Sequence, residues 1–318
     1  MIELALGLRE HVLPFLGAHS GRAHVKAGAG GDVTFAIDSE AEEYLERFLA
    51  GRAPEVAFYS EDRGLVAPDR GVAEWVLVVD PIDGTRPALA GFESSCVSVA
   101  AAPFGDGRPS MADVELGVIA EIKSGALFAA ERGKGIELRG AVGAAVGAAV
   151  GGASSVSLSR TTELSKLFWT LGFRGRPAIP LVTVLEELID ASSVGGAVFD
   201  LGSATYDLTR IVTGQLDAYL DVGTRIVEEA PALRARFEQV GGGAVLNNSP
   251  YDLAAAVLCV EEAGAIVTDA HGGSLAGRPL LGSGHDYQMS CVAAANAGLH
   301  AQILEVLERG FDRVRRIH

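Results

Sequence analysis

The stretch Val78–Thr85, VVDPIDGT, places two aspartates directly after a run of apolar residues. Residues 75–79 are apolar throughout, which predicts a strand buried on both faces. Asp80 and Asp83 then follow, and Gly84 introduces a turn. Two unpaired anions at the edge of a core destabilise a fold unless a positive group lies between them. The motif therefore predicts that something positive lies between the two carboxylates.

Three further acidic residues lie where other predicted elements begin or end. Asp38 begins an amphipathic helix, Glu61 follows a short strand, and Asp252 opens another helix. Such turns are where α/β folds gather catalytic side chains. Carboxylate and carbonyl oxygens are the ligands of hard divalent cations, and no histidine or cysteine cluster has the spacing of a zinc site. These acids together predict a magnesium site.

Each of these signals has a plainer alternative when it is taken alone. An aspartate at a helix start is often an N-cap, which applies to Asp38 and to Asp252. An Asp-Gly pair is usually a turn. The combination favours chemistry, because the Ile82 carbonyl offers a further oxygen ligand and the N–H groups of Gly84 and Thr85 can hold an anion. The Thr85 hydroxyl could also orient a water.

Net charge limits the partners of this 318-residue chain. With 26 basic and 41 acidic residues, the formal net charge is −15, which disfavours nucleic acid and anionic membranes as partners. A phosphorylated substrate would be repelled as well, unless cations are bound near it. The cysteines Cys96, Cys259 and Cys291 lie far apart, and no stretch has the pattern of a signal peptide or a membrane span. We therefore expect a soluble, cytoplasmic protein with reduced cysteines.

Apolar periodicity predicts strands that alternate with helices, which favours a layered α/β structure. The low-complexity run around 140–154 offers a boundary, so we expect an N-terminal α+β metal-binding subdomain at 1–152 and a C-terminal α/β subdomain at 153–318 that completes the site. A closing helix is predicted at 299–309, with Gly310 as its stop. The other predicted helices are 2–17, 39–50, 181–191, 205–213 and 253–263, and the predicted strands are 56–59, 75–79, 96–101, 116–120, 126–130, 197–200, 218–221 and 266–268.

Five segments of the chain, which follow one another in the family's order, resemble the inositol monophosphatase family of lithium-sensitive, magnesium-dependent sugar phosphatases. Val78–Thr85 is similar to the family's first signature, and Tyr251–Gly273 is similar to its second, with Tyr251 where tryptophan is usual. The resemblance implies a layered αβαβα sandwich. It also implies hydrolysis of a small phosphomonoester by a metal-activated water, with two or three Mg²⁺ ions per site. The other matching segments are GDVTFAIDSEAE, SED and DLGSATYDLTRIVTGQLDAYLD.

The resemblance also implies roles for individual residues. The implied metal ligands are Glu61, Asp80, Ile82 through its carbonyl, Asp83 and Asp252. The implied catalytic residues are Asp38, Thr85 and Glu61, with Asp38 and Thr85 activating the attacking water. The implied substrate-binding residues are Lys26, Asp83, Gly84, Thr85, Gly202, Ser203, Ala204 and Asp221.

Two features depart from the family's pattern. Arg86 and Pro87 follow Thr85, where the family has an asparagine and an aromatic residue. Residues 222–250 form an insertion between two implied site residues that lie only a handful of positions apart in the family, and 227–239 is predicted to be helical. The insertion is either a surface or dimer contact or a lid near the active site.

The arginines leave the substrate open. Arg174, Arg176 or the insertion's Arg225 could bind a second anionic group or be solvated charges, and Arg86 could be a surface residue, a salt partner or a phosphate contact. Inositol monophosphate or a similar polyol phosphate is the leading substrate, and fructose 1,6-bisphosphate is the alternative. A non-catalytic regulatory protein on the same fold is the alternative of another class, which the intact acids oppose. The resemblance further implies lithium sensitivity and a homodimer.

Overall fold

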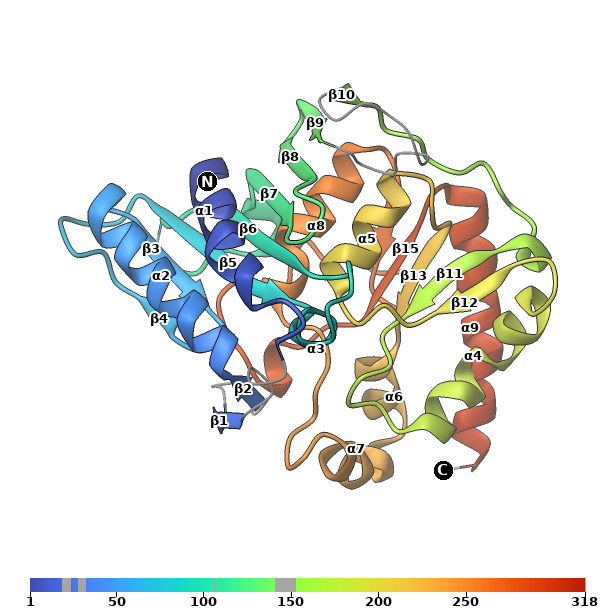
Figure 1. The fold of residues 1–318 in the computed structure, drawn as a ribbon. Coiled ribbons are helices and arrows are strands. Elements are labelled where there is room, and N and C mark those ends of the chain that lie inside the picture. The colour runs from blue at the N-terminus through green and yellow to red at the C-terminus, as the bar shows by residue number, and fades with distance from the viewer. Residues whose placement is uncertain (19–23, 28–32, 106, 141–152, 318) are drawn as a thin grey trace.

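The structure is a computed structural model, which describes residues 1–18, 24–27, 33–105, 107–140 and 153–317. Its elements stack as five layers in which helices and sheets alternate (Figure 1). The predicted αβαβα sandwich is therefore confirmed. None of the described helices combines the length and the apolar character that crossing a membrane requires.

An eight-stranded sheet forms the second layer, in the order β10-β9-β8-β7-β6-β5-β3-β4. Helices α1 (Ile2–Val12) and α2 (Ala36–Arg52) cover one face, while α5 (Ala204–Val212) and α8 (Pro250–Glu262) cover the other. The strands are β3 (Ala57–Ser60), β4 (Gly64–Val66), β5 (Trp75–Asp83), β6 (Cys96–Pro103), β7 (Leu116–Glu121), β8 (Leu127–Glu131), β9 (Gly135–Arg139) and β10 (Ala153–Ser154). Because β5 lies inside this sheet and is covered on both faces, its sequence is apolar without alternation.

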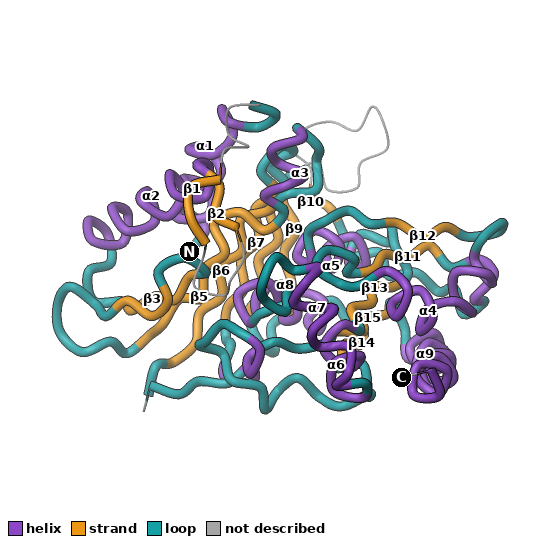
Figure 2. Tube along the Cα trace, turned by 90° about the horizontal axis from the view of Figure 1, so that it is seen from below, coloured by secondary structure: helices purple, strands orange, loops and turns teal. Residues whose placement is uncertain are grey.

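A five-stranded sheet forms the fourth layer, in the order β12-β11-β13-β15-β14. Helices α5 and α8 lie between the two sheets (Figure 2). Helices α4 (Ala178–Ser192) and α9 (Ala297–Ile317) form the outer layer on the far side of this sheet. The strands are β11 (Phe168–Leu171), β12 (Ala197–Phe199), β13 (Ala218–Asp221), β14 (Ile266–Thr268) and β15 (Cys291–Ala294).

Two predicted helix ends were wrong. The first helix stops at Val12, where a 3₁₀ turn that contains Pro14 follows, because proline cannot continue the hydrogen-bonding pattern of a helix. Gly310 does not end the closing helix, which continues to Ile317. A Cβ at Gly310 would lie 2.1 Å from the Val184 carbonyl oxygen, so this glycine lets α9 approach α4 closely. The other predicted helices and strands are present, with ends that shift by a few residues.

The insertion packs against the core in its first part, whereas residues 234–240 are largely exposed. It forms α6 (Gly223–Glu229) and α7 (Arg234–Val240), and Pro231 separates them where a single helix was predicted. Phe237 is fully buried in the apolar cluster that α4 and α9 share with the second sheet.

Arg225 is a structural residue of this insertion. Its side chain is 3% exposed, and its guanidinium lies 3.9 Å from the centre of the Phe311 ring. It donates to the Ala270 carbonyl at 2.6 Å and forms ion pairs with Glu229 and Glu308. The predicted role of Arg225 in binding a second anionic group is therefore wrong.

The predicted division of the chain at residue 152 stays a prediction. The two sheets fall on either side of that point, except that β10 follows it and still pairs with β9. Helices α5 and α8 come from the second half of the chain and bury residues against the first sheet. The two halves therefore share one continuous core.

Candidate active site

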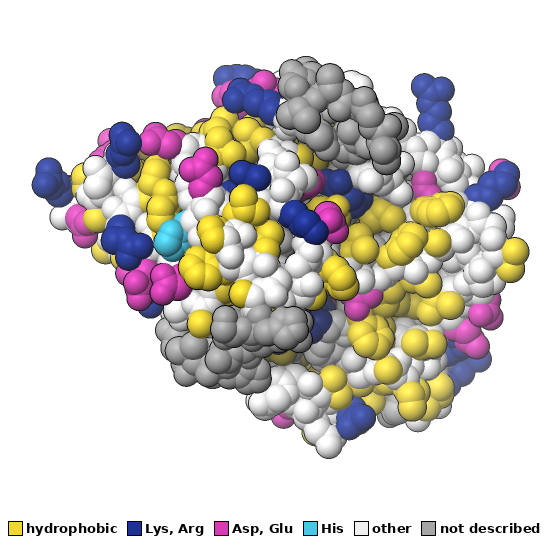
Figure 3. All heavy atoms as spheres, in the orientation of Figure 1, with side chains coloured by type: hydrophobic (Ala, Val, Ile, Leu, Met, Phe, Trp, Pro, Cys, Tyr) yellow, Lys and Arg dark blue, Asp and Glu magenta, His cyan; other side chains and the backbone are white. Residues whose placement is uncertain are grey.

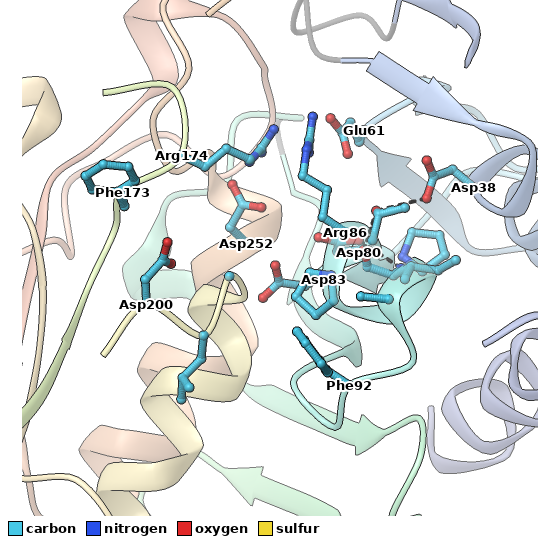
Figure 4. Close-up of a pocket in the computed structure, with 18 of the residues that line it drawn as sticks. Asp38, Glu61, Asp80, Asp83, Arg86, Phe92, Phe173, Arg174, Asp200 and Asp252 are labelled. Carbon is cyan, nitrogen blue, oxygen red and sulfur yellow. Dashed lines mark hydrogen bonds between the residues drawn. The ribbon is translucent and has the colours of Figure 1, made fainter. Parts of the chain in front are cut away.

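A cavity of about 480 Å³ opens between the ends of β5, α2 and α8. Figure 4 shows acidic side chains from these separate elements pointing into it. The predicted site residues on its wall are Asp38, Glu61, Asp80, Ile82, Asp83, Gly84, Thr85, Gly202 and Asp252. Most of the site that the sequence predicts is therefore brought together in one place.

Asp80, Asp83 and Asp252 form the acidic centre of this cavity. Each offers a carboxylate oxygen, and these oxygens all lie within 4.8 Å of one another. Residues three apart on a regular strand face opposite sides. The pairing of β5 with β6 shifts register between Asp80 and Asp83, and this irregularity lets both side chains serve one site.

Hydrogen bonds hold each of the three carboxylates in place. Asp83 Oδ2 accepts from the Ser203 hydroxyl at 2.8 Å and from the Thr205 N–H at 2.6 Å. Asp80 Oδ1 accepts from the Ile82 N–H at 2.9 Å. Asp252 lies in the first turn of α8, where its Oδ2 accepts from the Ser249 N–H at 2.6 Å. These hydrogen bonds each use one carboxylate oxygen to fix the orientation of the side chain.

Asp38 and Thr85 form a second functional unit beside this centre. Thr85 is the first residue of α3 (Thr85–Ala90), and its hydroxyl lies 3.0 Å from Asp38 Oδ1 (dashed in Figure 4). Asp38 lies in the first turn of α2, where its Oδ2 accepts from the Phe35 N–H at 2.8 Å. The alternative that Asp38 and Asp252 are N-caps is wrong, because the N-caps are Phe35 and Ser249. Each aspartate lies three residues after its N-cap, where one of its oxygens accepts from the N–H of that N-cap residue. The other oxygen of Asp38 is directed to the Thr85 hydroxyl.

Burial and mutual repulsion raise the pKa values of the acidic centre. The pKa of Asp80 is raised well above its usual value by burial and by the charges of Asp83, Asp252 and Glu61. Burial also raises the pKa of Asp83, against hydrogen bonds from Thr205 and Ser203 that lower it. Burial and the charge of Asp83 raise the pKa of Asp252 to about 8. A divalent cation removes this repulsion, so the donor set fits a metal ion of the kind that binds oxygen ligands.

This charge arrangement predicts a pH dependence of stability in the absence of metal. A carboxyl group whose folded pKa is raised destabilises the fold progressively as pH rises above its unfolded pKa. For Asp252 this window runs from its ordinary value of 3.8 to about 8. We therefore expect the unfolding temperature in EDTA to fall between pH 5 and pH 8, and saturating Mg²⁺ to remove most of that fall. Calorimetry at several pH values tests this, and a fall of equal size with Mg²⁺ would contradict it.

Comparison with known proteins places this geometry in a family. The protein-family model described as "Inositol monophosphatase family" matches residues 14–310 of this chain. The chain belongs to the inositol monophosphatase family. The fructose-1,6-bisphosphatase/inositol-1-monophosphatase of Methanothermobacter thermautotrophicus is 28% identical over 314 residues, which cover 96% of this chain and 95% of that protein. The inositol-1-monophosphatase of Caulobacter vibrioides is 28% identical over 286 residues and covers 89% of each chain.

Solved structures of inositol monophosphatase type share this fold. The suhB protein of Bartonella henselae superposes with a TM-score of 0.68 at 21% identity, covering 98% of this chain and 97% of that one. The Thermotoga maritima IMPase gives a TM-score of 0.66 at 18% identity, again over 98% and 97%. The chain therefore has the fold seen in these proteins.

Three residues that the family resemblance assigned to substrate, Ser203, Ala204 and Asp221, do not line the larger cavity. Asp221 is fully buried and forms an ion pair with the buried Arg176. Ser203 is 3% exposed and donates to Asp83, so it supports the acidic centre. Ala204 lies on a smaller neighbouring cavity. Lys26 lies on β1 (His24–Ala27), and its side chain falls outside the described part of the chain.

Glu42 is a residue of the active-site cavity that the sequence did not lead us to predict. It lies one helical turn after Asp38, on the wall of the cavity, and its carboxylate accepts from the Ser60 hydroxyl at 2.8 Å and from the Asp62 N–H at 3.4 Å. These partners flank Glu61, so Glu42 holds the turn that presents Glu61. Burial raises the pKa of Glu42 to about 7. The spacing of four residues on an amphipathic helix was the signal that could have identified it.

Proposed function

We propose that this protein is a Mg²⁺-dependent phosphomonoesterase that hydrolyses a small polyol or sugar phosphate, with inositol monophosphate as the leading substrate. One observation carries the proposal. The cluster of Asp80, Asp83 and Asp252, with its oxygens within 4.8 Å of one another, shares a cavity with the Thr85–Asp38 pair. Family membership and the names of the relatives support the same activity.

In the proposed reaction, one group of residues binds the metal ions and another orients the attacking water. Glu61, Asp80, the Ile82 carbonyl, Asp83 and Asp252 would hold two or three Mg²⁺ ions. When bound, these ions would neutralise phosphate charge and lower the pKa of a coordinated water. The Thr85 hydroxyl donates to Asp38, which directs a lone pair of the Thr85 oxygen toward the cavity. That lone pair can accept a hydrogen bond from the attacking water and orient it. As the proton of the water passes to the Thr85 oxygen, the Thr85 proton would pass to the Asp38 carboxylate.

Removal of the Thr85 hydroxyl should therefore slow the reaction. We expect Thr85→Val to lower kcat by about 10²–10³-fold, within the range that a positioned proton acceptor contributes. Thr85→Ser keeps the hydroxyl and should retain activity within about tenfold of the wild type. Steady-state phosphate release with saturating Mg²⁺ measures both variants. Equal kcat values for the valine and serine variants would contradict this role.

A phosphate-release panel tests the proposed function itself. Purified protein would be assayed with inositol 1-phosphate, fructose 1,6-bisphosphate, a nucleoside monophosphate and p-nitrophenyl phosphate, with Mg²⁺ or with EDTA. We expect Mg²⁺-dependent release that is fastest with the inositol phosphate. Absence of release from every compound would favour the non-catalytic alternative and overturn the proposal.

Fructose 1,6-bisphosphate remains the second candidate because of two arginines. Arg86 and Arg174 both line the cavity, and their guanidinium groups point to the same side of it in Figure 4. A guanidinium binds phosphate through two parallel hydrogen bonds, so either residue suits the second phosphate of such a substrate. The Methanothermobacter relative is named for both activities. Release from the bisphosphate alone would select this candidate.

We also propose that the protein is a cytoplasmic homodimer. Apolar side chains gather over the part of the molecule that carries β11, β12 and α4 (Figure 3), and Phe168, Val198 and Phe199 are exposed large apolar residues there. The three cysteines are buried and unpaired, which suits a reducing compartment. Sedimentation analysis tests the dimer, and a monomer at micromolar concentration would exclude it. Inhibition of phosphate release by lithium also stays a prediction, and the phosphate-release panel described above would measure it.

A further inference from the structure

The start of helix α5 contacts two of the three acids of the acidic centre. Ser203 is the N-cap of α5, and Thr205 lies in its first turn. The Thr205 N–H donates to Asp83 Oδ2 at 2.6 Å, and the Thr205 hydroxyl donates to the backbone carbonyl of Asp252 at 3.0 Å. One residue therefore connects the acid at the end of β5 with the acid at the start of α8.

The Thr205 side chain lies behind the active site rather than on its wall. Its exposed fraction is 0%, and it is not among the residues that line the active-site cavity. Burial raises the pKa of Asp83, and hydrogen bonds from the N–H and the hydroxyl of Thr205 oppose this rise. Any effect of Thr205 on a reaction in the cavity must therefore pass through Asp83 and Asp252.

Asp83 and Asp252 need such a connection because they belong to different layers of the fold. Asp83 ends a strand of the first sheet, whereas Asp252 lies on a helix between the two sheets. Their carboxylate oxygens lie within 4.8 Å of each other, and Figure 4 shows both side chains pointing into the same cavity. Without a cation the two charges repel each other, which favours a movement of β5 away from α8. Hydrogen bonds from Thr205 to both segments oppose that movement.

We propose that Thr205 is a positioning residue, which keeps Asp83 and Asp252 at the separation that a divalent cation requires. Groups that hydrogen-bond to metal ligands orient those ligands, and their loss weakens metal binding by about 10–100-fold. Ser203 also donates to Asp83, but it accepts from the Tyr206 N–H as the N-cap, so its loss would disturb the helix as well. The inference rests on the proposed metal-dependent function and adds a positioning role to it.

Thr209 provides a matched control on the same helix. It is also 0% exposed, and its hydroxyl donates to the Tyr206 carbonyl of α5 itself at 2.7 Å. The Arg210 guanidinium donates to Thr209 Oγ1 at 3.1 Å. Neither partner belongs to the acidic centre, so Thr209→Val removes a buried hydroxyl without touching the proposed metal ligands.

Metal binding without substrate tests the positioning role directly. Mn²⁺ serves as the probe, because it also prefers oxygen ligands and its free concentration is measured by electron paramagnetic resonance. Thr205→Val keeps the shape and the N–H but removes the hydroxyl, and we expect it to raise the Kd for Mn²⁺ about tenfold. Thr205→Ser keeps the hydroxyl and should bind within about threefold of the wild type, and Thr209→Val within about twofold.

Kinetics then separate positioning from a general loss of structure. We expect Thr205→Val to raise the Mg²⁺ concentration for half-maximal phosphate release about tenfold, and to change kcat at saturating Mg²⁺ less than about threefold. Circular dichroism in EDTA shows whether each variant is folded. Thr205→Ala removes the hydroxyl without placing a methyl group against the Asp252 carbonyl, so it tests the same contact if the valine variant does not fold.

The outcomes distinguish the positioning role from the proposed function. Equal Mn²⁺ affinity in the wild type and in the folded Thr205 variants that lack the hydroxyl would overturn the positioning role. Equal weakening in Thr205→Val and Thr209→Val would overturn it as well. Wild-type protein that binds Mn²⁺ but releases no phosphate would overturn the proposed function alone, whereas wild-type protein that binds no Mn²⁺ would overturn both.

Discussion

Asp80→Asn should lower Mg²⁺-dependent phosphate release by about 10²–10⁴-fold, because the metal's charge stabilisation of the transition state amounts to several kcal/mol. Asp80 is 4% exposed and shares the acidic centre with Asp83 and Asp252. The fold should remain intact, since asparagine has nearly the same shape and removes a carboxylate whose charge the burial opposes. Steady-state assays with Mg²⁺ titration, together with circular dichroism, measure both effects.

The same variant makes a second prediction that separates metal binding from folding. Mg²⁺ should raise the unfolding temperature of the wild type but change that of Asp80→Asn far less, since a ligand that binds the folded state stabilises it. Asp69→Asn, at an exposed position outside the active-site cavity, is the matched control and should behave as the wild type. Near-normal turnover in Asp80→Asn would remove Asp80 from the metal site.

Gly84→Ala should destabilise the protein by about 3 kcal/mol or more and abolish most activity. Gly84 has a φ of +89°, a left-handed conformation that costs roughly 1–2 kcal/mol for a residue with a side chain. A Cβ there would also lie 2.5 Å from the Ser94 carbonyl oxygen and 2.9 Å from Ser203 Cβ, and overpacking adds about 1–3 kcal/mol. Displacement of Ser203 would disturb its hydrogen bond to Asp83.

Gly71→Ala is the control for this effect. Gly71 has a similar φ of +75°, but its Cβ would meet nothing within 4 Å. We therefore expect Gly71→Ala to lose only the conformational cost, about 1–2 kcal/mol, and to keep full activity. Chemical denaturation of both variants measures the difference. Equal losses would show that the close approach at Gly84 is unimportant.

Local patterns predicted the layered fold well because they record burial directly. The unbroken apolar run before Asp80 marks a strand covered on both faces, and the structure shows α2 on one side of β5 and α8 on the other. The same reasoning failed at Gly310. A glycine near the end of a helical pattern usually marks a stop, but here it lies at a contact between α9 and the Val184 backbone.

The active site likewise has features that the sequence predicts and features that only the structure reveals. Sequence alone determined that five acids and Thr85 belong together, because their types, their positions at element ends and their order match one metal-dependent chemistry. It could not show that Arg225 is buried against Phe311 or that Asp221 holds Arg176, because charge in a sequence carries no information about burial. Only the tertiary structure decided where the insertion lies, since it buries Phe237 in the apolar cluster that α4 and α9 share with the second sheet. Such contacts depend on packing between distant segments, which no local pattern encodes.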